Sequence, residues 1–408
     1  MIRPAALTIL LATSFTLQAA DWPQWRGADQ HGHADPDQSP PTDFSDTKNV
    51  LWSADVPGRG HGSPSVVGDR VFLAVADEDA QTQGVLCLDR KSGKQRWLTT
   101  VHDGPFPKTN KKASHASCTP ACDGERVYIT FVNDGAAHLT ALTVDGEKLW
   151  QKKISDYVVH QGYGSSPAIY KDLVLVCADN KSGGATAAYD RVSGKRVWKH
   201  DRPKLPNYPS PTVFNLNGRD QLIMQGTELV TSLDPLTGKV IWEHEGATTE
   251  CVSSLATDGT HVFTSGGYPT NHVAAVVADG SGKITWDNTS RVYVPSMFVN
   301  DGYLFAVQDN GVAVCWDCKT GEEMWKERLG RTTSSSPVLV GDLIYSCDEG
   351  GQFFVHKADP KKFEIVAKNQ LGDETLSTPT ICDSQIFARV VHKSNRDRQE
   401  KLYCIGSN

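Results

Sequence analysis

The chain has 408 residues, of which 39% are hydrophobic and 22% are charged, a composition typical of one large repeat domain or two ordinary globular domains. Its 48 acidic residues outnumber 41 lysines and arginines, and the resulting formal net charge of −7, without a basic cluster, argues against a nucleic-acid partner. The 35 glycines and 21 prolines indicate many tight turns and few long helices.

Residues 1–20, MIRPAALTILLATSFTLQAA, have the pattern of a signal peptide. Arg3 precedes an apolar segment at residues 5–17, which is shorter than a membrane span requires, and two alanines end the segment. No other stretch could span a bilayer. The first cysteine is Cys87, so we predict no lipid anchor at the new N-terminus. We therefore expect a protein without a transmembrane segment that is periplasmic or secreted.

Residues 21–49 are interpreted as an N-terminal arm, with a polar loop rich in Asp, Gln, His and Pro after its first residues. The arm carries Trp22 and Trp25 on either side of Pro23. The two indoles are either apolar anchors that fasten the arm to the rest of the chain, or an exposed aromatic patch for carbohydrate or protein. Their spacing suits an extended arm in an apolar groove, which favours the anchor.

A hairpin motif begins at residues 84–97, GVLCLDRKSGKQRW, and recurs along the chain. Its further copies are 137–150, 185–198, 229–242, 273–286 and 312–325, and 353–366 is a degenerate copy. Each full copy has a glycine four residues before a tryptophan. In the first copy, Asp89 predicts an Asx turn and Gly93 the positive φ of a G1 bulge. The indole of Trp97 is expected to pack between neighbouring sheets.

A second motif combines a small polar residue, a proline, an apolar run and a turn, and it predicts the first strand of each sheet. Its eight copies are 62–71, 117–127, 165–174, 209–222, 252–262, 295–304, 335–344 and 377–386. Two independent motifs thus agree on the number of units. They predict an all-β fold, an eight-bladed β-propeller with four antiparallel strands per blade, over residues 50–408.

Each end of the propeller segment carries part of a blade. Residues 50–56, with Trp52, resemble a second hairpin strand that has no first strand before it. Residues 401–405 resemble a first hairpin strand that has no second strand after it. We therefore expect the N-terminal strand to complete the last blade and to close the ring.

The two motifs together resemble the repeat of the PQQ-like (pyrroloquinoline-quinone-like) β-propeller family. The resemblance rests on the hairpin that ends in Ser/Thr-Gly-Lys and Trp and on the Ser-Pro strand, and it covers about residue 22 to the C-terminus. The opening DWPQWRG is similar to the entry segment of secreted bacterial members without an assigned function. The family includes quinoprotein alcohol dehydrogenases and outer-membrane assembly factors. The resemblance implies the fold and leaves the activity open.

The family's enzymes imply a stacking indole, a Ca²⁺ ion held by carboxylate and amide oxygens, an Asp base and, in many members, a disulfide between adjacent cysteines. No motif in this sequence matches those residues, so we assign no catalytic residue, expect no enzyme activity and predict no cofactor. PQQ and Ca²⁺ would be the cofactors if the protein were such a dehydrogenase.

The ten cysteines admit disulfides in an exported chain, but most of them fall in apolar strands. Cys87 and Cys315 occupy the same small-residue position of the hairpin, as expected for buried structural thiols. Cys315 and Cys318 form a C-x-x-C that is followed by lysine, whereas haem attachment needs histidine there. This pair, and Cys118 with Cys122, leave a disulfide or redox role as the alternative.

The residues just before each Ser-Pro strand are expected to line the mouth of the central channel, because the innermost strands surround the propeller axis. We single out His61, His115, His160, Tyr163, Tyr208, Glu250, Arg291, Tyr293 and Arg331. Converging polar and aromatic side chains could bind a ligand. The alternative is a solvated mouth of the kind any propeller has, and we predict no metal site.

Three functions are compatible with these patterns. The first is an exported, monomeric and non-catalytic scaffold that binds a protein or a cell-envelope component. It is favoured by regular blades, short connections and the lack of a recognisable catalytic set. The second is a quinoprotein-like oxidoreductase that uses PQQ and Ca²⁺. The third is carbohydrate or small-ligand binding at the propeller mouth.

Overall fold

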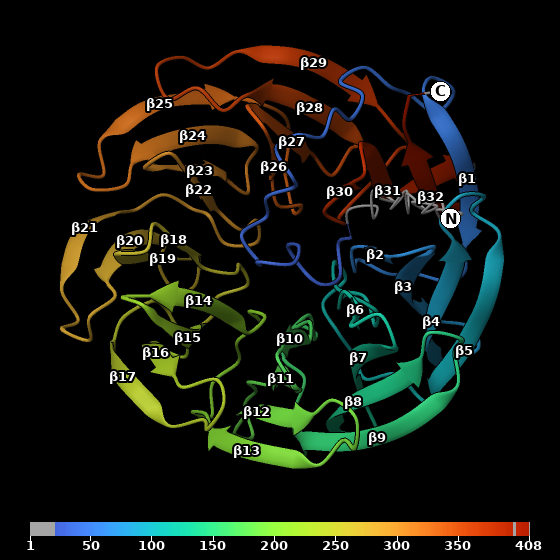
Figure 1. Ribbon diagram of the computed structural model, residues 1–408, viewed down its shortest axis with the longest axis horizontal. Helices are drawn as coiled ribbons and strands as arrows, with labels where there is room; N and C mark the ends of the chain where they lie inside the picture. Colours follow the sequence, from blue (N-terminus) through green and yellow to red (C-terminus); the bar gives the residue numbers. More distant parts are fainter. Residues whose placement is uncertain (1–20, 395–396, 408) are drawn as a thin grey trace, which may run out of the picture.

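The computed structural model describes residues 21–394 and 397–407, so the predicted signal peptide lies outside the described residues. The described strands form eight four-stranded sheets that stand around a common axis (Figure 1). Within each sheet, neighbouring strands pair antiparallel. The fold is therefore the predicted eight-bladed β-propeller. No described helix is long and apolar enough to span a membrane.

The blades are numbered in chain order, and in blades 1 to 7 the strands run from the axis outwards in sequence order. Blades 1 and 2 contain β2 (Ser65–Val67), β3 (Arg70–Asp77), β4 (Thr82–Asp89), β5 (Gln95–Asp103), β6 (Ala121–Cys122), β7 (Arg126–Asn133), β8 (Ala136–Thr143) and β9 (Lys148–Asp156). Blades 3 and 4 contain β10 (Ala168–Tyr170), β11 (Leu173–Cys177), β12 (Ala185–Asp190), β13 (Arg196–Asp201), β14 (Thr212–Leu216), β15 (Arg219–Gly226), β16 (Leu229–Leu233) and β17 (Val240–Glu245). Blades 5 and 6 contain β18 (Ala256–Thr257), β19 (His261–Gly266), β20 (His272–Val277), β21 (Ile284–Asn288), β22 (Phe298–Asn300), β23 (Tyr303–Val307), β24 (Val312–Asp317) and β25 (Glu323–Arg328). Blade 7 contains β26 (Val338–Val340), β27 (Leu343–Cys347), β28 (Gln352–Lys357) and β29 (Ile365–Gln370).

Blade 8 joins the two ends of the chain. Its inner three strands are β30 (Thr380–Cys382), β31 (Gln385–Ser394) and β32 (Asp397–Ile405), and its outermost strand is β1 (Val50–Val56). β1 pairs antiparallel with β32, and Trp52 lies opposite Cys404. The predicted closure of the ring by the N-terminal strand is confirmed.

The hydrophobic core lies between neighbouring blades. Phe72 and Val85 of blade 1, for example, share one buried cluster with Val127 and Ile129 of blade 2. All ten cysteines are buried and free, as expected for structural thiols. Burial raises the pKa of Cys118 to about 12, so this thiol stays protonated and unreactive near neutral pH.

The repeated glycine and tryptophan interlock adjacent blades. The indole N–H of Trp52 in blade 8 donates to the carbonyl of Arg90 in blade 1 at 2.8 Å. Gly93 has φ 68°, and a Cβ atom at Gly93 would lie only 2.4 Å from the Trp52 ring. Equivalent indole-to-carbonyl bonds are Trp97 to Val144, Trp150 to Val192, Trp198 to Pro235, Trp286 to Cys318 and Trp325 to Asp359. The motif therefore fixes the contact between successive blades.

The hairpin of the motif has the predicted local geometry. In blade 1 the register of β4 with β5 shifts between Cys87 and Leu88, which is the bulge. A carboxylate oxygen of Asp89 accepts a hydrogen bond from the main-chain N–H of Ser92 at 2.9 Å, which closes the Asx turn. The turn predicted from the sequence is therefore confirmed.

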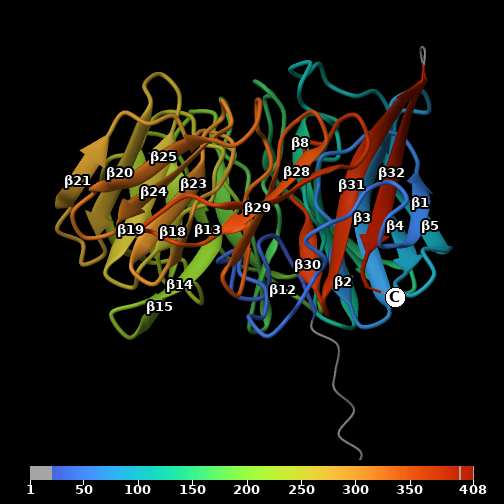
Figure 2. The ribbon, with the colours of Figure 1, turned by 90° about the horizontal axis from the view of Figure 1, so that it is seen from above.

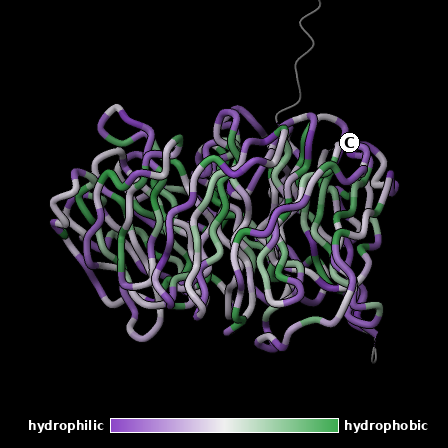
Figure 3. Tube along the Cα trace, turned by 90° about the horizontal axis from the view of Figure 1, so that it is seen from below, coloured by the Kyte–Doolittle hydropathy of each residue, from purple (hydrophilic) through white to green (hydrophobic). Residues whose placement is uncertain are grey.

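The ring has two different faces. One, the mouth face, carries the connections from each blade to the next. The other, the arm face, carries the turns between the first and second strands of each blade, and the first part of the arm lies against it near the axis (Figure 2). Residues 42–49 then run outwards past β29, the outermost strand of blade 7, to β1 (Figure 1). In Figure 3 hydrophilic segments gather at both faces, and hydrophobic segments fill the layer between them.

The arm binds the inner part of every blade. Its contacts, from blade 1 to blade 8, are Trp22 with Val66, Pro23 with Cys122, Gln24 with Ile169, Gln30 with Val213, Trp25 with Ser254, Arg26 with Met297, Ala34 with Leu339 and Gln38 with Ser384. Trp22 is 4% exposed and packs in the core cluster of blades 7, 8 and 1. The arm thus lies across the axis on this face, and Trp22 is an anchor.

Candidate functional site

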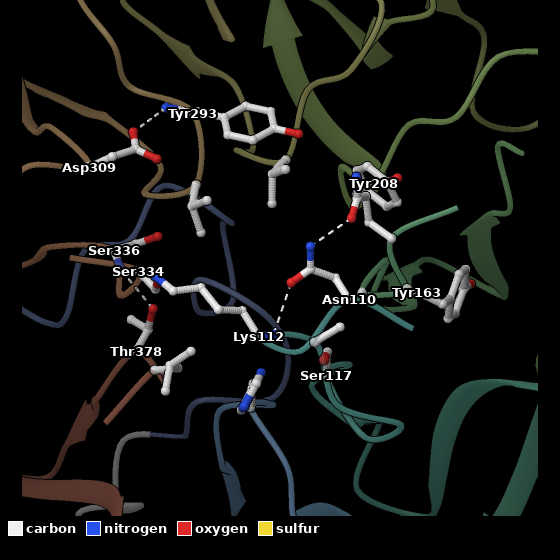
Figure 4. A pocket seen from close by; sticks show the side chains of 18 of the residues that line it. Asn110, Lys112, Ser117, Tyr163, Tyr208, Tyr293, Asp309, Ser334, Ser336 and Thr378 are labelled. Carbon is white, nitrogen blue, oxygen red and sulfur yellow. Dashed lines mark hydrogen bonds between the residues drawn. The ribbon is translucent and has the colours of Figure 1, made fainter. Parts of the chain in front are cut away.

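The central channel contains a cavity of about 430 Å³. Its wall is made by residues that lead into the innermost strands, and Trp25 of the arm contributes to it from the arm face. Figure 4 shows the labelled side chains arranged around this space, several of them directed into it. Because the arm lies across the channel on one face, the cavity is reached from the mouth face.

A ring of hydroxyl groups surrounds the channel. Each bond of the ring runs from a main-chain N–H just before an innermost strand to the Ser or Thr side chain at the equivalent position of the next blade, at 2.8–3.1 Å. The bonds are Ser63 to Thr119, Thr119 to Ser166, Ser166 to Ser210, Ser254 to Ser296, Ser296 to Ser336 and Ser336 to Thr378. The last of them is drawn in Figure 4. This network explains the small polar residue of the Ser-Pro motif.

Trp25 joins the same ring. Its indole N–H donates to the Ser254 hydroxyl of blade 5 at 2.9 Å. Among the described contacts, this hydroxyl accepts no main-chain N–H from blade 4, so Trp25 takes the place of the missing bond. Trp25 therefore has a role that neither sequence interpretation gave it: one indole, Trp22, anchors the arm, and the other, Trp25, lines the cavity.

A loop between blades 1 and 2, residues 104–116, reaches over the mouth of the cavity. Lys112 on this loop pairs with Glu349 of blade 7, with Nζ at 2.9 Å from a carboxylate oxygen. Figure 4 shows the Lys112 side chain extended across the mouth towards Ser334. Asn110 fixes the loop from the other side through its side-chain bond to Gln161 at 2.8 Å. The loop narrows the entrance.

Few charges face the cavity. Among the described residues, its lining carries one Lys or Arg, Lys112, and two carboxylates, Glu349 and Asp309. Glu349 is engaged by Lys112 and also accepts from the Ser334 hydroxyl at 2.6 Å. Asp309 accepts the main-chain N–H of Tyr293 at 2.7 Å, and burial raises its pKa. The lining is thus close to neutral, with a slight excess of negative charge.

His61 lines the cavity as a neutral base. Its Nε2 atom is buried and has no hydrogen-bond partner. Burial, and then the positive charges of Arg59, Arg389 and Arg398, lower the pKa of His61 to about 3. The imidazole therefore carries no charge at neutral pH, which leaves one ring nitrogen as an acceptor.

The low pKa of His61 predicts a contribution to acid unfolding. Its unfolded-state pKa is near 6.5, so between pH 6.5 and about 3 the unfolded chain binds a proton that the folded chain does not. Stability must then fall as the pH falls through this window, by up to about 1.4 kcal/mol per pH unit for this one group. We expect His61→Gln to have a shallower dependence of unfolding free energy on pH between 6.5 and 4, measured by urea unfolding. Parallel curves for the two proteins would contradict this prediction.

The nine residues expected at the mouth divide into two sets. Four of them line the cavity: His61, Tyr163, Tyr208 and Tyr293. Five are not part of its lining: His115, His160, Glu250, Arg291 and Arg331. Their binding role stays a prediction.

Four of the five residues outside the lining have side-chain partners of their own. His115 stacks on Phe106 with ring centroids 4.2 Å apart. His160 pairs with Glu250 at 3.1 Å, and the Glu250 carboxylate also accepts from the Tyr293 hydroxyl at 3.3 Å. Arg291 lies over the Tyr293 ring at 5.0 Å and donates to the carbonyl of Gly267, while Arg331 is exposed.

Sequence reasoning missed Trp25, Lys112, Glu349 and the hydroxyl ring as parts of one site. The Ser or Thr of the second motif recurs in all eight blades and is a usable signal for the ring, although the motif by itself predicts only the start of a strand. Lys112 and Glu349 meet across the ring, 237 positions apart, and no local pattern indicates such a pair.

The family's enzymes raise the question whether PQQ and Ca²⁺ fit this cavity. PQQ is a tricarboxylate, and the lining meets it with one ammonium group that is already paired and with two carboxylates. Calcium takes six to eight oxygen ligands, usually from several carboxylates and carbonyls. Within residues 21–394 and 397–407 no three His, Cys, Asp or Glu side chains gather in a group that could hold a metal. The residues present do not fit this cofactor pair.

Comparison with known proteins gives relatives of two kinds. A curated relative, the outer membrane protein assembly factor BamB of Moranella endobia, is 24% identical over 347 residues, which cover 81% of this chain and 82% of the relative. Among solved structures, BamB from Moraxella catarrhalis has a TM-score of 0.59 at 16% identity, over 87% of this chain and 96% of that chain. A europium-containing methanol dehydrogenase has a TM-score of 0.65 at 14% identity, over 94% and 98%. These structural similarities show the shared propeller fold.

A family model matches most of the chain. The model described as outer membrane protein assembly factor BamB matches residues 44–98, 81–327 and 269–362, which together extend through most of the propeller. This chain therefore belongs to the PQQ_2 family of outer membrane protein assembly factor BamB.

Proposed function

We propose that this protein is an exported, non-catalytic scaffold that binds a protein of the bacterial cell envelope through the mouth face of its propeller. The observation that carries the proposal is the family match over residues 44–362 on a complete propeller ring. The BamB relatives, named as assembly factors, support an interaction role. Location in the periplasm or outside the cell is part of the proposal and rests on the signal-peptide pattern of residues 1–20.

The asymmetry of the ring supports the mouth face as the binding face. The arm already lies across the centre of the opposite face and is bonded to all eight blades. The mouth face carries the connections between blades and has no such cover among the described residues. Exposed apolar side chains do not distinguish the two faces, because Val158 and Tyr268 on the mouth face are matched by Val192 and Leu236 on the arm face.

Site-specific crosslinking tests this proposal. The photoreactive residue p-benzoylphenylalanine replaces Tyr268 or Val158 on the mouth face and, as a matched control, the exposed Leu236 in a turn of the arm face. After irradiation of cells that express each variant, we expect discrete crosslinked species from the mouth-face positions and not from Leu236. Crosslinks only from Leu236, or from no position, would contradict the proposed binding face.

The non-catalytic part of the proposal has its own test. It is supported by the cavity lining, which does not suit a tricarboxylate cofactor or a Ca²⁺ ion. The purified protein is incubated with PQQ and Ca²⁺ and assayed for dye-linked oxidation of methanol, longer alcohols and aldoses. We expect no turnover above a control without protein. Turnover that requires both additions would favour the oxidoreductase instead.

A further inference from the structure

The cavity presents hydrogen-bond donors that the fold does not use. Five hydroxyl groups of the ring line it: Thr119, Ser166, Ser210, Ser336 and Thr378. Each accepts a main-chain N–H from the preceding blade, and within the described part of the chain none of the five donates a hydrogen bond. A hydroxyl group that accepts one bond keeps its own proton free to rotate towards another acceptor. The ring thus offers several donors to the channel.

Two further polar atoms of the lining are buried without a partner. The Tyr208 hydroxyl makes no hydrogen bond of normal geometry, although its side chain is 9% exposed, and Nε2 of His61 is likewise unpaired. Buried polar groups are nearly always paired, because an unpaired one loses its bonds to water without replacement. Neither atom has surface open to the cavity, so the ring hydroxyls, and not these two atoms, are the groups available to a ligand.

Aromatic rings complete the lining. Trp25 contributes from the arm side, and Tyr163, Tyr208 and Tyr293 contribute from the blades. Rings of this kind pack against aliphatic C–H groups and still leave polar edges for hydrogen bonds. The volume, about 430 Å³, lies in the range of small-molecule pockets, roughly 300–1,000 Å³.

The charges of the lining select against ionic ligands. Lys112 and Glu349 neutralise each other across the mouth, and the remaining carboxylate, Asp309, is held by the main-chain N–H of Tyr293. An anionic ligand would meet a slight excess of negative charge. A cation would find only this one buried and already bonded carboxylate.

We propose that this cavity is a binding site for a neutral sugar of mono- or disaccharide size. Sugar hydroxyl and ether oxygens accept from the free ring hydroxyls, and the C–H face of the sugar packs on the aromatic rings. The ligand enters from the mouth face, either as a free sugar or as the end of a polymer. This inference goes beyond the scaffold function and stands on the cavity alone.

A charge series on one sugar ring provides the test. Glucuronate differs from glucose at C6 and glucosamine differs from it at C2, each by one charged group, and titration calorimetry compares the three sugars at pH 6, where both groups are ionised. The same measurement covers neutral hexoses, pentoses and N-acetylhexosamines and their disaccharides, and retention on amylose and on insoluble glucan tests a polymer-borne sugar. We expect at least one neutral sugar to bind, and its charged counterparts to bind at least tenfold more weakly.

Variants link binding to the cavity. Thr378→Val removes one of the five ring hydroxyls that line the cavity and keeps the shape of the side chain, and we expect it to weaken binding roughly threefold to tenfold, the effect of one neutral hydrogen bond. Ala113→Trp fills the entrance from the 104–116 loop and should abolish binding. Tyr303→Phe changes a tyrosine of β23 outside the lining and should leave the affinity unchanged.

Three results would overturn the proposal: no neutral sugar binds in solution or on a polymer, a charged sugar binds as tightly as its neutral counterpart, or Ala113→Trp binds like the native chain. Saturation-transfer NMR on the native protein gives a readout without any variant, so a folding defect in one variant leaves the proposal testable. Mouth-face crosslinks that persist without sugar binding would retain the scaffold function and reject the sugar site.

Discussion

Gly93→Ala should destabilise the propeller by about 3 kcal/mol and open it at the junction of blades 8 and 1. Two physical effects add at this position. An alanine at φ 68° costs about 1–2 kcal/mol relative to its ordinary backbone conformation. Its Cβ would also lie 2.4 Å from the Trp52 ring, and overpacking of a filled contact costs about 1–3 kcal/mol. Urea unfolding followed by tryptophan fluorescence measures the change.

The chain supplies a matched control for this substitution. Gly135 has φ 67°, and a Cβ atom there would meet nothing within 4 Å. Gly135→Ala therefore carries the backbone cost alone, and the difference between the two variants isolates the contact with the indole. Equal destabilisation of both proteins would mean that Gly93 is needed only for the turn, and that its contact with the Trp52 ring adds nothing measurable to stability.

Asp179→Ala should cost about 3–5 kcal/mol in unfolding free energy. Asp179 and Arg202 pair at 3.3 Å, and their side chains are 0% and 1% exposed. Asp179 also accepts from Asn207 at 3.0 Å, while Arg202 donates to Thr231 of blade 4. Removal of the carboxylate leaves a buried guanidinium without its counter-ion at the contact of blades 3 and 4. Thermal and urea unfolding measure the loss.

Asp201→Ala is the control for this prediction. Asp201 pairs with Lys199 at 2.7 Å on the same blade, but its side chain is 83% exposed. Solvent screens such a pair, so we expect its loss to change the midpoint of unfolding little. An equal loss of unfolding free energy in the two variants would show that burial does not determine how much the Asp179–Arg202 pair contributes to stability.

The number of blades and the closure of the ring were predictable because both depend on local patterns. The turn from Asp89 to Gly93 repeats with its tryptophan, and the Ser-Pro strand repeats independently of it. The degenerate copy in blade 7 lacks the glycine and the tryptophan, but it still accepts the bond from the preceding blade. The carbonyl of Asp359 accepts the indole N–H of Trp325 at 2.8 Å. A main-chain acceptor does not depend on side-chain identity, so the sequence motif can decay while the contact remains.

The course of the arm was not predictable from such patterns. Its bonds to the blades come from irregular backbone and from single side chains such as Gln24, Gln30 and Gln38, each to a different strand. No periodicity marks these residues. The cavity was predicted only in part for the same reason. His61 and Tyr208 precede Ser-Pro strands and were found by position, whereas Trp25 and Lys112 reach the channel from segments that lie outside the repeat.

The contacts of the arm and β1 impose an order on folding. Gln38 binds Ser384, and Asp55 pairs with Lys401, each across 346 positions of the chain. During synthesis the arm and β1 therefore cannot form these contacts until blade 8 has been synthesised, whereas adjacent blades can pack as soon as each is complete. Such distant contacts make the final closure slow relative to local pairing. The same contacts hold both ends of the chain, so we expect the folded ring to open first where blade 8 and the arm separate.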